Sequence, residues 1–298
     1  MESYRRFLLP EVICKLRRID LKARLVVEGF LTGLHRSPYK GFSVEFAEYR
    51  QYMPGDELKR IDWKVYAKTD RFYIREYQEE TNLRAYLLLD TSGSMGYKAN
   101  GRLTKLEYAS YLAASLAYLL LKQKDSVGLV QFATKIENYI PARQSGAHLS
   151  VLLHALDKIK PGGETDLAQT FHQLAERIRR RGLVIILSDL FDSKDRVIKA
   201  LSHFRHRKHE VLVFHILDRN ELDFAFSQPL ILKDLETQKE LTLDPRIVKK
   251  DYQYAVNEFF NDFRRRCRES LVDYHLILTD TPFDRALFSY MEKRKRLG

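Results

Sequence analysis

The residues of this chain that could do chemistry are oxygen donors placed directly after apolar runs. Asp90, Ser92 and Ser94 alternate after the apolar run at 85–89, and Gly93 lets the backbone turn tightly between the two serines. Carboxylate and hydroxyl oxygens without His or Cys select Mg²⁺, Mn²⁺ or Ca²⁺ over zinc. Because Mg²⁺ keeps several of its waters, a few protein oxygens suffice to hold it. The spacing therefore indicates a divalent-cation site.

Two later residues can complete this site. Thr165 lies where a helical pattern opens, and Asp189 follows a second apolar run at 183–187. Taken singly, each of these residues is explained by helix capping or by a turn at a strand end. Taken together and in this order, they favour a metal site over capping. With Asp90 and Asp189 as its carboxylates, the cation would be roughly neutralised and could still accept a carboxylate from outside.

Elements that can position these residues appear from residue 83 onward. Apolar, strand-like runs lie at 85–89, 127–132, 183–187, 211–217 and 274–278. Helical patterns lie between them at 104–122, 148–159, 166–180, 194–207, 245–269 and 283–294. Such apolar runs are typical of parallel strands covered on both faces, so we expect an α/β fold with a doubly wound, mainly parallel sheet. A β-hairpin at 230–243 interrupts the alternation and is expected at the surface or an edge.

The region before residue 83 is mixed, with a predicted helix at 11–29 and strand-like pieces at 42–49 and 72–78. Between these pieces lies a dense set of unusual residues: Arg50, Tyr52, Pro54, Gly55, Asp56, Asp62 and Trp63. Its Pro-Gly-Asp run predicts a turn. No nucleophile or His completes a catalytic set, so the charged members are expected to form structural ion pairs or partner contacts. Trp63 is expected to anchor this segment to the main domain.

The pattern Asp90-x-Ser92-x-Ser94, with Thr165 and Asp189, resembles the metal-ion-dependent adhesion site of von Willebrand factor A domains. The resemblance implies that both serines and the threonine bind the ion directly. It also implies that the two aspartates act largely through water. The sequence departs from the family at Leu190, where many members have Gly.

The stretch Arg50-x-Tyr52-x-Pro54-Gly55-Asp56, followed by Asp62-Trp63, is similar to the domain-of-unknown-function 58 family of bacterial and archaeal proteins. The two resemblances together span nearly the whole chain. They imply a family-specific α+β segment at 1–82, packed on a von Willebrand factor A-like domain at 83–298. Members are commonly associated with MoxR-type AAA+ ATPases, which implies such a partner here. Nothing in the sequence identifies a client.

Bulk properties narrow the remaining possibilities. No stretch is apolar over the roughly 20 residues that a membrane-spanning helix needs, and the two widely separated residues Cys14 and Cys267 suit a reducing cytosol. We therefore expect a soluble, cytoplasmic protein. Its formal net charge of +11 could indicate nucleic-acid binding. Three of the four basic clusters, however, lie late in predicted helices or just after them, where cations complement the helix dipole.

The expected function is a cation-dependent protein-binding module, an adaptor or co-chaperone for a MoxR-type ATPase, and not an enzyme. A basic nucleic-acid-binding protein remains an alternative, which salt-dependent binding would support. A metal-dependent hydrolase is a second alternative. It would need a general base beside the ion, and the candidate histidines lie on predicted helices.

Overall fold

The computed structural model describes residues 9–36, 49–52, 63, 66–67, 70–75, 83–99, 103–164 and 166–295. At its centre is a six-stranded sheet with the strand order β10-β7-β6-β3-β4-β5. Its strands are β3 (Arg84–Asp90), β4 (Ser126–Phe132), β5 (Ile136–Arg143), β6 (Leu183–Ser188), β7 (Glu210–Leu217) and β10 (Asp273–Leu278). Within this sheet β5 pairs with β4 in the antiparallel sense, and the other neighbours are parallel. The predicted doubly wound, mainly parallel sheet is confirmed.

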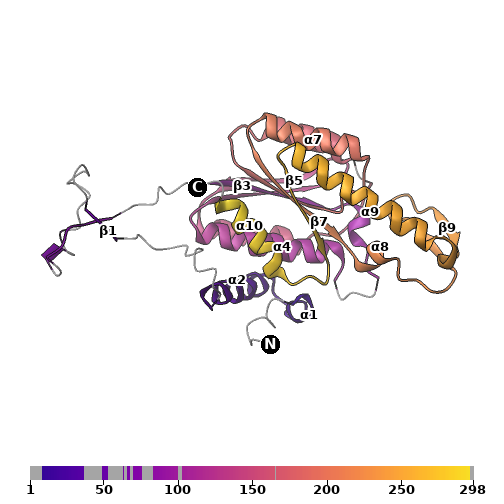
Figure 1. The fold of residues 1–298 in the computed structure, drawn as a ribbon, viewed down its shortest axis with the longest axis horizontal. Coiled ribbons are helices and arrows are strands. Elements are labelled where there is room, and N and C mark those ends of the chain that lie inside the picture. The colour runs from indigo at the N-terminus through magenta and orange to yellow at the C-terminus, as the bar shows by residue number, and fades with distance from the viewer. Residues whose placement is uncertain are drawn as a thin grey trace.

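Helices cover both faces of the sheet (Figure 1). On one face lie α2 (Ile19–Arg36), α4 (Lys105–Lys122), α5 (Gly146–Asp157) and α10 (Phe283–Lys295). On the other face lie α6 (Leu167–Arg177), α7 (Lys194–His206) and α9 (Pro245–Glu269). Successive residues such as Leu87 and Leu88 on β3 therefore enter different cores, and both are almost completely buried. Burial on both faces explains why the strands read as continuous apolar runs.

The sequence did not predict the edge strand β5. Its residues are half-buried or exposed, in contrast to the buried residues of β4 beside it. Because this strand contributes little to either core, it lacks the apolar run that marks the other strands. The short helix α8 (Arg219–Asp223) was also not predicted.

The N-terminal region contributes to the main core. The predicted helix at 11–29 is two helices, α1 (Pro10–Ile13) and α2, separated by Cys14–Arg18. On α2, the buried residues Ala23, Val26, Val27 and Phe30 belong to the same core as α4. Further along, β1 (Tyr49–Gln51) pairs with β2 (Tyr73–Arg75), and Figure 1 draws β1 apart from the six-stranded sheet.

The predicted hairpin is confirmed as β8 (Leu230–Lys233) and β9 (Glu240–Leu243), which pair with each other. It lies beside the start of α9 at one end of the molecule (Figure 1). Ile231 and Leu241 on the hairpin are 62% and 61% exposed. None of the helices that the structure describes is long and apolar enough to cross a membrane.

Candidate metal centre

The predicted metal residues meet where the strand order of the sheet reverses. From β3 the chain first adds β4 on one side and later places β6 on the other side. In doubly wound sheets, ligands bind at this switch point, beyond the carboxyl ends of the strands. Asp90 ends β3, and Ser188 and Asp189 end or follow β6. The topology therefore brings Asp90 and Asp189, which are almost 100 positions apart in the sequence, to the same edge of the sheet.

Asp90 is completely buried and fixed by hydrogen bonds to both of its carboxylate oxygens. Its Oδ1 accepts from the backbone N–H of Ser92 at 2.9 Å, and its Oδ2 accepts from the Ser188 hydroxyl at 2.5 Å. Ser188 was not among the predicted site residues. It holds Asp90 across the switch point and also accepts a hydrogen bond from the backbone N–H of Leu190 at 2.8 Å.

The two serine hydroxyls have the spacing that neighbouring metal ligands need. Ser92 Oγ and Ser94 Oγ are 3.1 Å apart, on the turn that leads into the 3₁₀ helix η3 (Gly93–Gly96). Two ligands at right angles, each about 2.1 Å from Mg²⁺, would be roughly 3 Å apart. Both hydroxyls could therefore coordinate one ion without moving apart.

Thr165 lies outside the described residues. The loop that carries it is hydrogen-bonded to the turn at residues 91–94, called the serine turn below. The backbone N–H of Gly93 donates to Gly163 O at 3.0 Å, and that of Gly162 donates to Thr91 O at 2.9 Å. Asp166, next to Thr165, caps α6 by accepting from the backbone N–H of Gln169 at 3.1 Å.

Among the described residues, only one of the two carboxylate oxygens of Asp189 has a hydrogen-bond partner. Its Oδ2 accepts from the ammonium group of Lys105 at 2.8 Å, and both side chains are 1% exposed. Its Oδ1 is buried and has no hydrogen-bond partner among the described residues. A buried carboxylate oxygen without a partner is costly, and a metal ion or a metal-bound water would satisfy it. The donor set therefore fits a hard divalent cation.

Besides Ser188, sequence reasoning also missed Lys105 and Glu221 of this centre. Lys105 also donates to Glu221 on α8 at 2.6 Å and thus connects α4, the end of β6 and α8. One signal was present in the sequence. Lys105 lies on the same helical face as Ala109, Leu112 and Leu116, all buried, and a lysine on a buried face must find an internal counter-ion.

The electrostatics of the centre favour a bound cation. Burial and the neighbouring charge of Asp189 raise the pKa of Asp90 to about 7. Burial alone would lower the pKa of Lys105, but Asp189 and Glu221 outweigh it and raise that pKa above its usual value. The ammonium group of Lys105 contacts Asp189 and Glu221 but not Asp90, so Asp90 faces the charge of Asp189 without a cation of its own among the described residues. A divalent cation near Asp90 and Asp189 would supply positive charge there.

No group of three or more His, Cys, Asp or Glu side chains among the described residues is arranged to hold a metal. A cation at this centre would therefore depend on the serine hydroxyls as well as on the carboxylates.

The departure at Leu190 has a structural explanation. Its φ is 51°, in the left-handed region that glycine adopts without cost, and its side chain is 1% exposed. The left-handed conformation costs an L-residue roughly 1–2 kcal/mol. Burying a leucine in a core stabilises by about 2–5 kcal/mol relative to alanine. Burial therefore outweighs the strain, and the loop keeps a glycine-like shape with leucine in place.

The β8–β9 hairpin lies against the serine turn. A Cβ added to Gly93 would be 3.1 Å from Leu235 O on the hairpin and 3.2 Å from Gly163 O. The value of φ at Gly93 does not fall in the left-handed region. Gly93 is thus needed for the close approach of two backbones, not for the tight turn that the sequence suggested.

The N-terminal motif residues are only partly described. Pro54, Gly55, Asp56 and Asp62 lie outside the described residues. Arg50 lies on β1, and the backbone N–H of Tyr52 donates to Phe72 O at 2.9 Å.

The expectation that Trp63 is buried against the main domain is wrong. Its side chain is 59% exposed, and its ring makes edge contacts with Tyr66 and Phe72 of the same segment. A tryptophan can satisfy its packing within a small local cluster, and sequence alone does not distinguish this from core burial.

The fold, a mainly parallel sheet with helices on both faces, is that of a von Willebrand factor A-like domain, and an additional segment precedes it. The family model described as "Protein of unknown function DUF58" matches residues 48–259, and the chain belongs to this family. The match includes the segment around Arg50 and every predicted metal residue.

The chain is similar to relatives and solved structures. The uncharacterized protein Rv1480 of Mycobacterium tuberculosis is 25% identical over 294 residues, which cover 96% of this chain and 91% of the relative. The conserved hypothetical protein BatB from Bacteroides thetaiotaomicron is 13% identical, with a TM-score of 0.50, and covers 72% of this chain and 100% of its own. The SpRpn10 VWA domain is 11% identical, with a TM-score of 0.42, and covers 70% and 94%. The likeness to BatB shows the fold alone.

Proposed function

We propose that this chain is a divalent-cation-dependent protein-binding module that captures a carboxylate of its partner. The observation that carries this proposal is the convergence of Asp90, Ser92, Ser94 and Asp189 at the switch point, where the buried Asp189 Oδ1 has no hydrogen-bond partner in the described part of the chain. Ser92, Ser94 and Thr165 would hold Mg²⁺, Mn²⁺ or Ca²⁺, with Asp90 and Asp189 outside them. The bound ion would supply positive charge for an incoming carboxylate.

A binding role fits this centre better than hydrolysis. Hydrolysis needs a general base that can reach a metal-bound water. The buried His215 lies beside the centre, next to Ser188 in the sheet, but its Nδ1 is 2.9 Å from the hydroxyl of Tyr274 and burial lowers its pKa to about 4, so it is a poor general base. His172 and His203 contact each other between α6 and α7, with 2.9 Å between their Nδ1 atoms.

Family membership supports a MoxR-type AAA+ ATPase as the first partner to test, in an adaptor or co-chaperone role. Such a partner would need an exposed Asp or Glu at its contact surface. Binding to the purified ATPase should require Mg²⁺ and disappear in EDTA.

The direct test is titration calorimetry with Mg²⁺ and Mn²⁺. We expect wild type to bind one ion, and Asp90→Ala and Ser92→Ala to lose binding while keeping their circular dichroism spectra. Glu258→Ala, which removes an exposed carboxylate from α9, is the matched control and should bind like wild type. If Asp90→Ala still captures the ATPase in EDTA as well as wild type does in Mg²⁺, the ion-bridged mechanism is wrong.

A further inference from the structure

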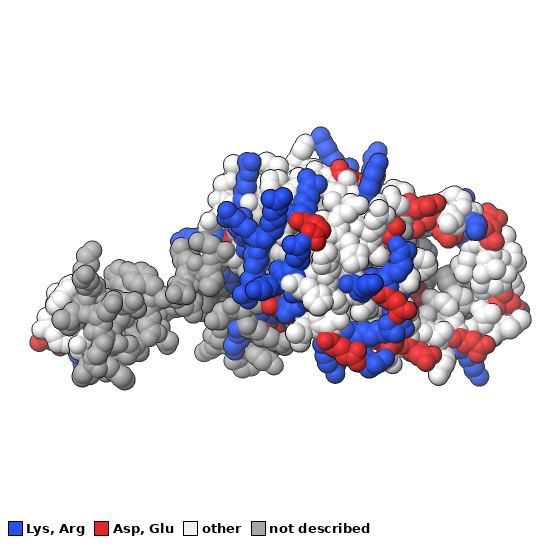
Figure 2. Space-filling model, turned by 90° about the horizontal axis from the view of Figure 1, so that it is seen from above, with Lys and Arg blue, Asp and Glu red and all other residues white. Residues whose placement is uncertain are grey.

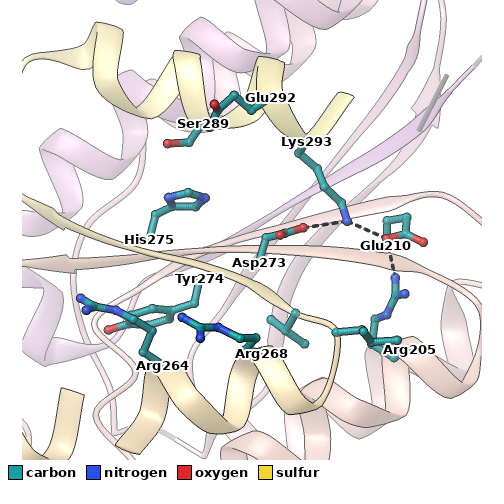
Figure 3. A pocket seen from close by; sticks show the side chains of 12 residues that line it. Arg205, Glu210, Arg264, Arg268, Asp273, Tyr274, His275, Ser289, Glu292 and Lys293 are labelled. Carbon is teal, nitrogen blue, oxygen red and sulfur yellow. Dashed lines mark hydrogen bonds and ion pairs between the residues drawn. The ribbon is translucent and has the colours of Figure 1, made fainter. Parts of the chain in front are cut away.

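The six-stranded sheet ends at β10, and no described strand lies along its outer edge. A cavity of about 460 Å³ runs beside this edge between α9 and α10 (Figure 3). It lies near Glu210 and Asp273, where β7 and β10 begin. The metal centre lies at the opposite, carboxyl ends of the strands. The groove is therefore a separate surface.

The backbone of β10 has polar groups directed at the groove. In a strand, alternate residues direct their N–H and C=O groups to opposite sides. Thr279 N donates to Leu217 O on β7, whereas Leu278 N donates to the Thr281 hydroxyl. The backbone groups of Leu278 therefore point away from β7. Leu276 and Tyr274, two and four residues earlier, point the same way, toward the outer edge of the sheet. An unpaired edge of this kind can accept another strand.

Two arginines give the groove a positive side. Arg264 and Arg268 reach from α9 toward β10 (Figure 3). Both are exposed, and neither has an ion-pair partner among the described residues. Their neighbours Arg265 and Arg266 are paired with carboxylates on α7 and α9. At this end of α9, Arg264 and Arg268 are therefore the arginines that remain available to a carboxylate of a binding partner.

The opposite wall has a different character. Ser289 and Glu292 come from α10, and His275 lies on that side of β10 (Figure 3). At the end of the groove, Lys293 is neutralised by Glu210 and Asp273 at 2.6 and 2.7 Å. One wall is therefore basic, and the other is neutral to acidic.

The two walls correspond to the two faces of the sheet. The ring of Tyr274 packs on Phe263 of α9 at 5.3 Å, whereas the ring of His275 lies 6.1 Å from Phe214 in the core on the α10 side. A strand added beside β10 would alternate in the same way, since its side chains point to opposite faces in turn. Every second side chain would then meet Arg264 and Arg268, and the others would meet Ser289 and Glu292.

We propose that this groove binds an extended segment of a partner protein by strand addition, with carboxylates on the face toward α9 and uncharged or basic side chains on the face toward α10. A polypeptide fits better than a nucleic acid because only a peptide backbone supplies donors and acceptors at strand spacing. A second copy of this chain fits poorly, since each copy carries a formal charge of +11. Lys and Arg gather over the α7 and α9 face in Figure 2, which would attract an acidic segment.

The test uses the full chain in EDTA, so that its outcome does not depend on the metal centre. The probe is a short fluorescein-labelled peptide in which Thr and Glu alternate. The control peptide has the same composition, with its Glu residues grouped at one end. We expect the alternating peptide to bind about tenfold more tightly than the grouped one, because only its pattern places every Glu on one face.

Matched variants localise the binding. Arg264→Gln and Arg268→Gln should each weaken the alternating peptide about two- to fivefold, the size of an exposed charge pair. Arg265→Gln, the same change on the same helix at a residue already paired, should leave affinity unchanged. Hydrogen exchange at the amides of Tyr274 and Leu276 should slow when the peptide binds.

Several results would overturn the proposal. They are absence of binding by wild type, equal affinity for the two peptides, unchanged affinity in the Arg264→Gln, Arg268→Gln double variant, and exchange protection outside β10. A single-stranded oligonucleotide that protects β10 and displaces the peptide at equal concentration would assign the groove to nucleic acid instead.

Discussion

At the scale of single residues, the candidate metal centre is organised around a buried lysine. Lys105 is 1% exposed and donates to Asp189 and Glu221. Removing one member of a buried ion pair leaves an uncompensated charge, which typically costs about 3–5 kcal/mol. Both Lys105 and a bound divalent cation would neutralise negative charge on the carboxylates of this centre.

We predict that Lys105→Met lowers the free energy of unfolding by about 3–5 kcal/mol in EDTA. Mg²⁺ should restore part of this loss, because the cation supplies the missing positive charge. The measurement is thermal unfolding with and without Mg²⁺. Lys122→Met, at the exposed end of the same helix, should behave like wild type. An equal Mg²⁺ effect on all three proteins would contradict the prediction.

The strained backbone at Leu190 gives a second residue-scale prediction. Leu190→Gly should be less destabilising than Leu190→Ala, by on the order of 1 kcal/mol, because glycine removes the cost of the positive φ. At the buried Leu187, in the extended strand β6, the order should reverse. Urea unfolding of the four variants measures both differences. The same order at both positions would show that Leu190 is not strained.

At the scale of elements, the β8–β9 hairpin packs closely on the serine turn. A Cβ added to Gly93 would lie 3.1 Å from Leu235 O on the hairpin, so the two elements leave little room there for a side chain. This contact places the hairpin beside the surface that a partner of the metal centre would approach.

We predict that Gly93→Ala displaces the hairpin turn and costs about 1–3 kcal/mol, as overpacking does in a core. Hydrogen exchange at residues 234–238 should become faster, and affinity for Mn²⁺ should fall. Gly146→Ala is the control, since a Cβ there would meet nothing within 4 Å. Unchanged exchange in the hairpin of Gly93→Ala would mean that the turn absorbs the methyl group elsewhere.

At the scale of the whole molecule, the N-terminal helix α2 completes the core that the sheet and α4 begin. Five of its apolar side chains are buried there: Ile19, Ala23, Val26, Val27 and Phe30. Burying each of the four larger ones contributes about 1.5–3 kcal/mol, so their sum is comparable with the net stability of a typical domain.

We predict that residues 83–298 alone do not form a stable protein, although they contain every strand of the central sheet. A chain starting at residue 9 should fold, and a separate peptide of residues 9–36 should rescue the truncated chain. Circular dichroism and sedimentation measure both effects. A truncated chain that unfolds at the same temperature as the longer one would show that α2 is dispensable.

Charge is also distributed unevenly over the whole molecule. Figure 2 shows Lys and Arg gathered toward one end of the α7 and α9 face, and more Asp and Glu toward the other. Basic residues occupy the last turns of α6, α7, α9 and α10, as expected for cations that complement helix dipoles. Among the described residues, these basic helix ends lie away from the carboxyl ends of the strands, where the candidate metal centre is.

The sequence by itself determined the fold class and pointed to the main donors of the candidate site. Runs such as 183–187 are apolar because both faces of the sheet are covered, and the chemistry of Asp90, Ser92 and Ser94 follows from residue type. Strand ends could be located because the apolar run stops where the polar edge begins. These are local properties of the chain.

Only the tertiary structure decided which distant residues join them. Lys105 and Glu221 come from separate helices, and the edge strand β5 is too exposed to leave an apolar run in the sequence. Whether Trp63 is buried, and which backbones crowd Gly93, depends on packing between elements that sequence periodicity does not encode. The physical reason is that periodicity reports which face of an element is covered, but not what covers it.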